Sequence, residues 1–102
     1  MKNCLRTAML RTQVKVPWEE GLHLRHAAGV VLLARRFRSK ISLRFGGRLA
    51  DARSILSIVM LCASMGAVLE VEASGDDASD AVRAMEVEFS IEESVHPFSE
   101  TA

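Results

Sequence analysis

The sequence predicts an α+β fold, a two-layer open-faced sandwich in which three helices cover one face of a four-stranded antiparallel sheet. Four short segments alternate apolar and polar residues, and three others place apolar residues at helical spacing, in the order β-α-β-β-α-β-α. Gly46-Gly47 and the short connections favour antiparallel pairing. With 102 residues, 49% of them hydrophobic, the chain can bury one core. We expect a domain over 9–91, a flexible extension over 1–8 and a disordered acidic tail over 92–102.

The first third of the chain predicts a strand, a loop and a helix. Met9–Val16 alternates, with Leu10, Thr12, Val14 and Val16 on one face. Pro17–Gly21 interrupts this pattern and predicts a loop. A helix is then expected from Leu24 to about Phe37, with its inner face marked by Ala27, Ala28, Val31, Leu32 and Arg35.

The middle third predicts a hairpin followed by a second helix. Lys40–Phe45 alternates, Gly46-Gly47 supplies the two-residue turn, and Arg48–Ala50 forms the short return strand. Ser54 is expected to cap a helix that runs to about Ser64, because a serine hydroxyl can accept a hydrogen bond from a first-turn N–H group. Cys62 falls in this apolar stretch and is predicted to be a buried free thiol.

The last third predicts a strand and a helix. Val68–Ala73 alternates around Glu70 and Glu72. A final helix is expected from about Asp77 to Ile91, because apolar residues there recur at helical spacing (Ala78, Ala81, Val82, Met85 and Phe89).

Formal charge is divided unevenly between the two halves of the chain. Residues 1–53 hold twelve Lys and Arg against three Asp and Glu, and residues 54–102 hold one against ten. The basic half could attract acidic protein partners, or the charges could mix on the folded surface. The basic residues form no recognised nucleic-acid motif, so we expect no nucleic-acid partner. The longest apolar run, 27–34, is too short to span a membrane, and the two cysteines suggest no disulfide framework, so we expect a cytoplasmic chain.

His23 stands at the start of the first predicted helix and is the strongest candidate for chemistry. A helix N-terminus offers unpaired N–H groups and partial positive charge, which suit an anion. Arg25 adds a forked donor for the same oxygens. These residues predict an anion site with a reactive histidine, and a histidine that only caps the helix is the alternative.

Two motifs resemble one family. Gly21-Leu22-His23-Leu24-Arg25-His26-Ala27-Ala28 is similar to the active-site signature of the HPr family, the histidine phosphocarriers of the phosphoenolpyruvate-dependent sugar phosphotransferase system. Asp51-Ala52-Arg53-Ser54-Ile55-Leu56 is similar to the start of its regulatory-serine helix. Ser54 follows His23 at the separation expected in that family. The resemblance covers roughly 9–91 and implies the open-faced sandwich already predicted.

The resemblance implies that His23 accepts a phosphoryl group from enzyme I and passes it to EIIA-type proteins, in sugar uptake or its nitrogen-related regulatory branch. Arg25 and the amides of Leu24 and Arg25 would hold the phosphoryl oxygens. Such a chain is a carrier with a phosphohistidine intermediate rather than a free-standing enzyme, it works as a monomer, and it needs no cofactor or metal.

The resemblance assigns two further roles. Ser54 matches a serine that a dedicated kinase phosphorylates in some bacteria, and a phosphatase would reverse this. The family's docking patch corresponds here to an apolar set, with Arg25, Arg48 and Arg53 expected around it: Leu24, Ala28, Ile55, Leu56 and Val59.

One residue departs from the family pattern. His26 stands where the family has proline, and its ring could influence a phosphohistidine or face solvent. The spacing of His23 and His26 could also hold a metal, although no third ligand is evident. Two other hypotheses therefore stay open: a non-catalytic HPr-like regulatory module that controls a kinase or transcription factor, and an unrelated α/β sandwich in which both motifs are coincidental.

Overall fold

The computed structural model describes residues 9–91. Within this range the elements follow the predicted order β-α-β-β-α-β-α. The proposed extension over 1–8 and tail over 92–102 lie outside the described residues, as do Cys4 and His96.

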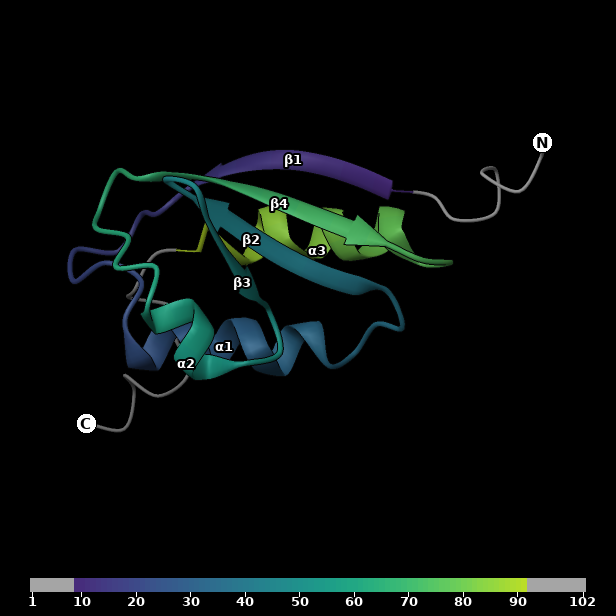
Figure 1. Cartoon of the computed structure of the whole chain (residues 1–102), viewed down its shortest axis with the longest axis horizontal. Helices are drawn as coiled ribbons and strands as arrows, with labels where there is room; N and C mark the ends of the chain where they lie inside the picture. The colour runs from purple at the N-terminus through teal and green to yellow at the C-terminus, as the bar shows by residue number, and fades with distance from the viewer. Residues whose placement is uncertain (1–8, 92–102) are drawn as a thin grey trace.

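Four strands form one antiparallel sheet in the order β1-β4-β2-β3 (Figure 1). The turn between β2 and β3 is the Gly46-Gly47 pair, whose φ angles of 56° and 82° are ones that glycine adopts readily. The strand bounds agree with the predicted ones to within a residue: β1 (Met9–Lys15), β2 (Lys40–Phe45), β3 (Arg48–Asp51) and β4 (Val68–Ser74).

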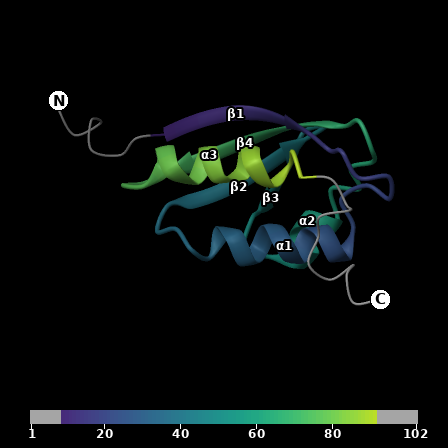
Figure 2. The ribbon, with the colours of Figure 1, turned by 180° about the vertical axis from the view of Figure 1, so that it is seen from behind.

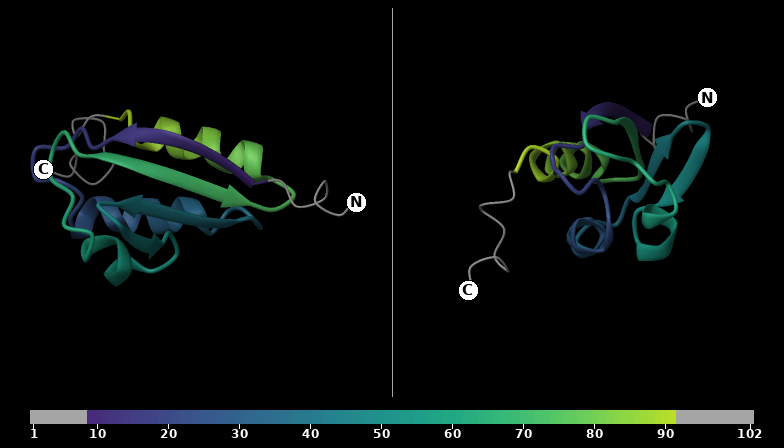
Figure 3. Two further views of the ribbon diagram at one scale, coloured as in Figure 1. Left: turned by 45° about the horizontal axis from the view of Figure 1, so that its top comes forward. Right: turned by 90° about the vertical axis from the view of Figure 1, so that its left-hand side faces the viewer.

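Helices α1 (Leu24–Ala34), α2 (Ile55–Val59) and α3 (Ala78–Glu88) share one face of the sheet (Figure 2). Two views at right angles show α1 and α2 together on the β2–β3 side, with α3 across β1 and β4 (Figure 3). The core fills the space between sheet and helices, and its largest fully buried side chains include Ile41, Leu43, Ile58, Leu69 and Met85. The open-faced sandwich is confirmed.

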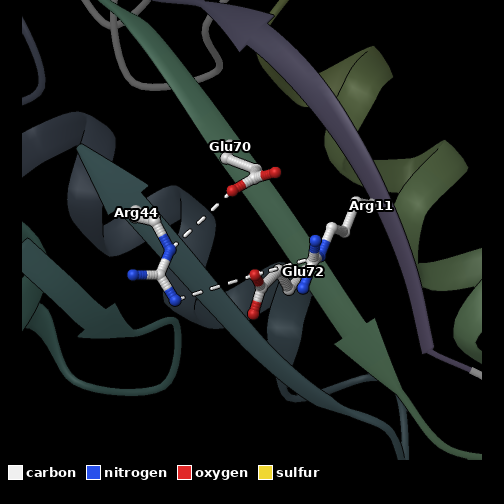
Figure 4. Close-up of polar contacts among 4 residues, drawn as sticks. All are labelled: Arg11, Arg44, Glu70 and Glu72. Carbon is white, nitrogen blue, oxygen red and sulfur yellow. Dashed lines mark ion pairs between the residues drawn. The ribbon is translucent and has the colours of Figure 1, made fainter. Parts of the chain in front are cut away.

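The face of the sheet opposite the helices carries charged side chains from three strands. Glu72 on β4 pairs with Arg11 on β1 at 3.2 Å between Oε2 and Nε (Figure 4). Arg44 on β2 reaches Glu70 at 3.7 Å and Glu72 at 3.8 Å. Opposite charges on neighbouring strands favour this register, and they give the uncovered face of the sheet a polar surface that water can hydrate. Part of the uneven charge along the sequence is therefore mixed on one surface.

Asp77 joins the loop before β2 to the start of α3. Its Oδ1 accepts hydrogen bonds from the backbone N–H of Ser39 at 2.9 Å and from the Ser39 hydroxyl at 2.5 Å. Its Oδ2 accepts from the N–H of Arg38 at 2.9 Å. Asp77 is the residue before α3 but makes no side-chain cap on that helix, which begins at Ala78. The hydrogen bonds from Ser39 and Arg38 lower the pKa of the Asp77 carboxyl.

We expect Asp77→Asn to lose part of the acid sensitivity of folding. A carboxyl whose pKa is lower in the folded chain stabilises it above the unfolded pKa, near ~3.9, and this stabilisation is lost as the pH falls through the folded pKa. Urea denaturation at pH 7 and at pH 3 should therefore show a smaller loss of stability on acidification in Asp77→Asn than in the wild type. Asp80→Asn, an exposed change on the same helix, serves as the control. An equal acid loss in wild type and Asp77→Asn would contradict the role of this carboxyl.

Two helices end earlier than predicted. α1 stops at Ala34 rather than near Phe37, because the chain changes to tighter turns: Phe37 N–H bonds to Ala34 O. Arg53 then binds the Phe37 carbonyl through its guanidinium at 2.5 Å. α2 stops at Val59 rather than near Ser64.

The end of α2 also overturns the prediction for Cys62. Cys62 N–H bonds to Val59 O in a tight turn, and Cys62 adopts a φ of 54°, the left-handed region that ends a helix. Its thiol is free and exposed, not buried. A glycine commonly marks this conformation, and its absence here hid the helix end in the sequence.

In residues 9–91, none of the helices is both long and apolar enough to cross a membrane.

Candidate functional site

The site begins with a close contact between two loops. Gly21 has a φ of 82°, and a Cβ at this position would lie 2.8 Å from the carbonyl oxygen of Ala63. The next residue, Leu22, donates its N–H to that same oxygen at 2.9 Å and buries its side chain. Only glycine fits this approach without displacing the Ala63 backbone. The loop before α1 is therefore fixed against the segment after α2.

His23 follows directly and is the residue before α1. Its backbone is extended (φ −104°, ψ −166°), its carbonyl accepts the N–H of Ala27 at 2.9 Å, and its side chain makes no cap on the helix. The imidazole is exposed. The first-turn amides of Leu24 and Arg25 precede the first intrahelical hydrogen bond, so helix geometry directs them out of the N-terminal end of α1. An exposed imidazole beside such amides can carry an anion or become part of one.

His23 borders a shallow groove between the two loops. The groove encloses about 220 Å³ and is lined by Glu20, Leu22, His23, Val59, Cys62, Ala63 and Ser64. Of the residues predicted for the site, the structure thus brings His23 and Val59 together. Glu20 and Cys62 were not predicted to lie there, and no spacing in the sequence indicates it, because the contact depends on how two loops pack.

An apolar surface lies beside this groove on α1 and α2. Leu24 is 61% exposed and Leu56 is 73% exposed, whereas Ala28, Ile55 and Val59 are half-buried. The exposed Met60 and Leu49 extend the surface and were not predicted. We call this set of seven residues the apolar patch. Large apolar side chains exposed together are typical of a surface that contacts another protein.

Arg53 and Arg48, which were expected around the patch, donate hydrogen bonds to backbone carbonyls. Arg53 donates to the carbonyls of Phe37, Ala34 and Ser39, just beyond and at the end of α1. The Arg53 guanidinium thus turns towards the C-terminal end of α1, and its place beside the patch stays a prediction. Met60 follows the last residue of α2, and Arg48 donates to its carbonyl at 3.1 Å while remaining exposed.

His26 packs into the interior, so the option that it faces solvent is wrong. It is 2% exposed, and its ring stacks on the indole of Trp18 with centroids 4.1 Å apart and planes within 4°. Its Nε2 lies 3.6 Å from Oε1 of Glu20. Trp18 in turn contacts Phe89 and donates from Nε1 to the Ile91 carbonyl at 2.9 Å. The buried residues of α1 are consequently shifted from the predicted ones: His26, Ala27, Val30, Val31 and Ala34.

Ser54 lies at the other end of α2 from the groove. Its hydroxyl oxygen accepts the N–H of Ser57 at 3.3 Å, which confirms the predicted cap. Ser54 precedes Ile55 and Leu56, so a group added to its hydroxyl would stand at the margin of the apolar patch. In the part of the chain that the structure describes, no three His, Cys, Asp or Glu side chains converge as metal ligands.

The fold and the site together place the chain among small α+β domains that carry a histidine at a helix N-terminus. In this chain, helices cover one face of an antiparallel sheet, and an exposed His23 precedes the first helix. The family model described as "PTS HPr component phosphorylation site" matches residues 10–90. The chain belongs to the HPr family, the phosphocarriers of the phosphotransferase system.

Relatives and solved structures agree with this assignment. The chain is 35% identical over 74 residues to phosphocarrier protein HPr of Buchnera aphidicola, covering 72% of this chain and 87% of the relative. It is 34% identical over 77 residues to phosphocarrier protein HPr of Cupriavidus necator, which covers 76% of this chain and 86% of that relative. The crystal structure of HPr from Bacillus anthracis superimposes with a TM-score of 0.77 at 32% identity, covering 80% of this chain and 98% of that one.

Proposed function

We propose that this chain accepts a phosphoryl group on His23 from the phosphoenolpyruvate-dependent enzyme I and transfers it to EIIA-type proteins. The observation that carries the proposal is the exposed His23 imidazole at the N-terminal end of α1, inside a segment that matches the family's phosphorylation-site model. The downstream pathway is sugar uptake or its nitrogen-related regulatory branch.

The chemistry is a pair of in-line displacements. A lone pair on a neutral His23 imidazole nitrogen attacks phosphorus, an N–P bond forms, and the bond from phosphorus to the enzyme I donor breaks. In the second step a nucleophile of the EIIA-type acceptor attacks the same phosphorus and the His23 N–P bond breaks. The amides of Leu24 and Arg25 and the Arg25 guanidinium stabilise the phosphoryl oxygens in both steps. An exposed site suits a carrier, because the group has to leave as readily as it arrives.

Partners dock on the apolar patch. Leu24 and Leu56 supply exposed apolar area next to His23, and Arg25 and Arg48 supply positive charge for acidic partner surfaces. Such a patch suits brief encounters, since each partner must dissociate after transfer. The chain acts in this scheme as a cytoplasmic monomer, without nucleic-acid or membrane partners and without a cofactor or metal.

A kinase acting on Ser54 would regulate these encounters, and a phosphatase would reverse it. A phosphoryl group on Ser54 would add negative charge at the margin of the apolar patch, where it would repel acidic partners. The hydroxyl that now caps α2 would be the modified group.

A regulatory module is the second candidate. Crh of Bacillus subtilis, described as a catabolite repression HPr, superimposes with a TM-score of 0.66 at 30% identity. A module of that kind would use the same patch to control a kinase or transcription factor and would not need His23 to accept a phosphoryl group.

Phosphorylation by enzyme I separates the two candidates. We expect the chain, incubated with phosphoenolpyruvate and enzyme I from the same genome, to gain one acid-labile phosphoryl group on His23, seen by intact-mass and peptide analysis at neutral pH. Added EIIA-type protein should then remove the group. A folded sample that gains nothing, while an HPr of known activity is phosphorylated in parallel, would reject the carrier function and favour the regulatory module.

A further inference from the structure

A buried imidazole lies one helical turn from His23. His26 is 2% exposed and is held by its stack on Trp18, which is itself buried and hydrogen-bonded to the Ile91 carbonyl. The ring is thus fixed on one face by an aromatic neighbour and cannot turn away without losing that stack. A histidine side chain can take up a proton, whereas the proline that the family has at this position cannot.

Glu20 connects this imidazole to the groove. Its Oε1 lies 3.6 Å from His26 Nε2, and the same side chain lines the groove together with His23. The Glu20 side chain is 40% exposed, so it stands between the buried ring and solvent. One carboxylate therefore faces both the fixed imidazole and the space that a phosphoryl group on His23 would enter.

We propose that Glu20 and His26 form a proton-linked pair that determines how stably His23 holds its phosphoryl group. This inference rests on the proposed function of His23. A phosphoryl group on His23 carries roughly two negative charges. It would enter a groove that already contains the Glu20 carboxylate, so the phosphoryl group and the carboxylate repel each other. A proton on His26 offsets the carboxylate. By linkage, the phosphorylated state favours proton uptake by His26, and protonated His26 favours the phosphorylated state to the same extent.

Other charged or titratable groups surround the pair. Glu88 on α3 comes close to α1 one turn further along, where its Oε2 lies 3.0 Å from the position that a Cβ on Gly29 would take. Arg25 in the first turn of α1 and His23 just before that helix are near in sequence, and Cys62 lines the groove. The Glu88 carboxylate and the Arg25 guanidinium act on a charged His26 with opposite signs. Glu20 is the one carboxylate among the described residues that line the groove, and its Oε1 approaches His26 Nε2, so Glu20→Gln removes the negative charge that both His26 and a phosphoryl group on His23 would meet.

The test uses the full chain with His96→Ala, so that phosphoramidate can phosphorylate His23 chemically without enzyme I. Every phosphohistidine is acid-labile, so the readout is the ratio of phosphohistidine lifetimes between a variant and this parent at each pH. We expect Glu20→Gln to lengthen the lifetime about threefold to tenfold at pH 8 and by a smaller factor at pH 6, because a proton on His26 compensates the Glu20 carboxylate.

Matched variants separate this role from a structural one. Glu19→Gln removes the same charge from the neighbouring exposed residue, outside the groove lining, and should leave the lifetime ratio near one at both pH values. In His26→Gln the effect of Glu20→Gln should no longer depend on pH. If His26→Gln fails to fold, NMR titration of His26 in the parent decides instead: its midpoint should move to higher pH when His23 is phosphorylated.

Three results would overturn the proposal. The first is a lifetime ratio for Glu20→Gln that is the same at pH 6 and pH 8, and the second is a Glu19→Gln lifetime ratio equal to that of Glu20→Gln. The third is a His26 titration midpoint that does not move when His23 is phosphorylated. Because phosphoramidate replaces enzyme I, these outcomes are separate from the test of the carrier function. Failure of enzyme I to phosphorylate the wild-type chain would reject that function and leave this measurement intact.

Discussion

Replacing His23 by alanine is expected to abolish phosphoryl acceptance from enzyme I, with a loss of more than about a thousandfold in initial rate, while the chain stays folded. The imidazole supplies the only nucleophile in this scheme, and its backbone and neighbours cannot replace it. The side chain is exposed and makes no cap on α1, so its removal should change the free energy of unfolding by about 0.5 kcal/mol or less. Intact-mass analysis at neutral pH and urea denaturation followed by circular dichroism measure the two quantities.

His96→Ala provides the matched control for His23→Ala, because it removes another histidine from the same chain. It should be phosphorylated at the wild-type rate. Retention of one phosphoryl group in His23→Ala would show that a different residue is the acceptor, and the carrier scheme on His23 would then be wrong.

Trp18→Ala is expected to cause the largest loss of stability, about 3–5 kcal/mol in the free energy of unfolding. The indole is 3% exposed, stacks on His26, contacts Phe89 and donates to the Ile91 carbonyl. Truncation leaves a cavity under the site loop and removes the Nε1 donor from the Ile91 carbonyl, which lies beyond the end of α3. A loss of this size is a large part of the total stability of a domain of this length. Urea denaturation followed by circular dichroism measures it.

Trp18→Phe separates packing from hydrogen bonding at this position. Phenylalanine keeps an aromatic ring against His26 but loses the Nε1 donor, so we expect a smaller loss, about 1–2 kcal/mol. Leu32→Ala, an exposed change on α1, should lie within about 0.5 kcal/mol of wild type. A Trp18→Ala loss no greater than that of Leu32→Ala would mean that the loop is not anchored by the indole.

The sequence predicted the strands well because their patterns are local. Alternation gave each strand to within a residue, and the Gly46-Gly47 pair gave the hairpin. Ser54 was found for the same reason, since a cap depends on a residue three positions away. These features need no knowledge of the rest of the fold.

Features that depend on contacts between distant segments were not predicted. Glu20 and Cys62 meet His23 only because one loop packs on another, and Arg53 turns to α1 because its guanidinium donates to carbonyl oxygens at and just beyond the end of that helix. The burial of His26 was not predicted, because a polar residue interrupts the apolar pattern that Val30 and Ala34 continue. The stack on Trp18 allows burial of that imidazole, and no periodicity indicates such a partner.

The position of Trp18 has an optical consequence. The chain contains one tryptophan and no tyrosine, so its near-ultraviolet emission comes from that single indole. The indole lies face to face with His26, and a protonated imidazole in contact with an excited indole quenches its emission. Intrinsic fluorescence of the unlabelled chain therefore reports on the packing of Trp18 against His26, one helical turn from His23, and a stopped-flow instrument can follow it in real time during turnover.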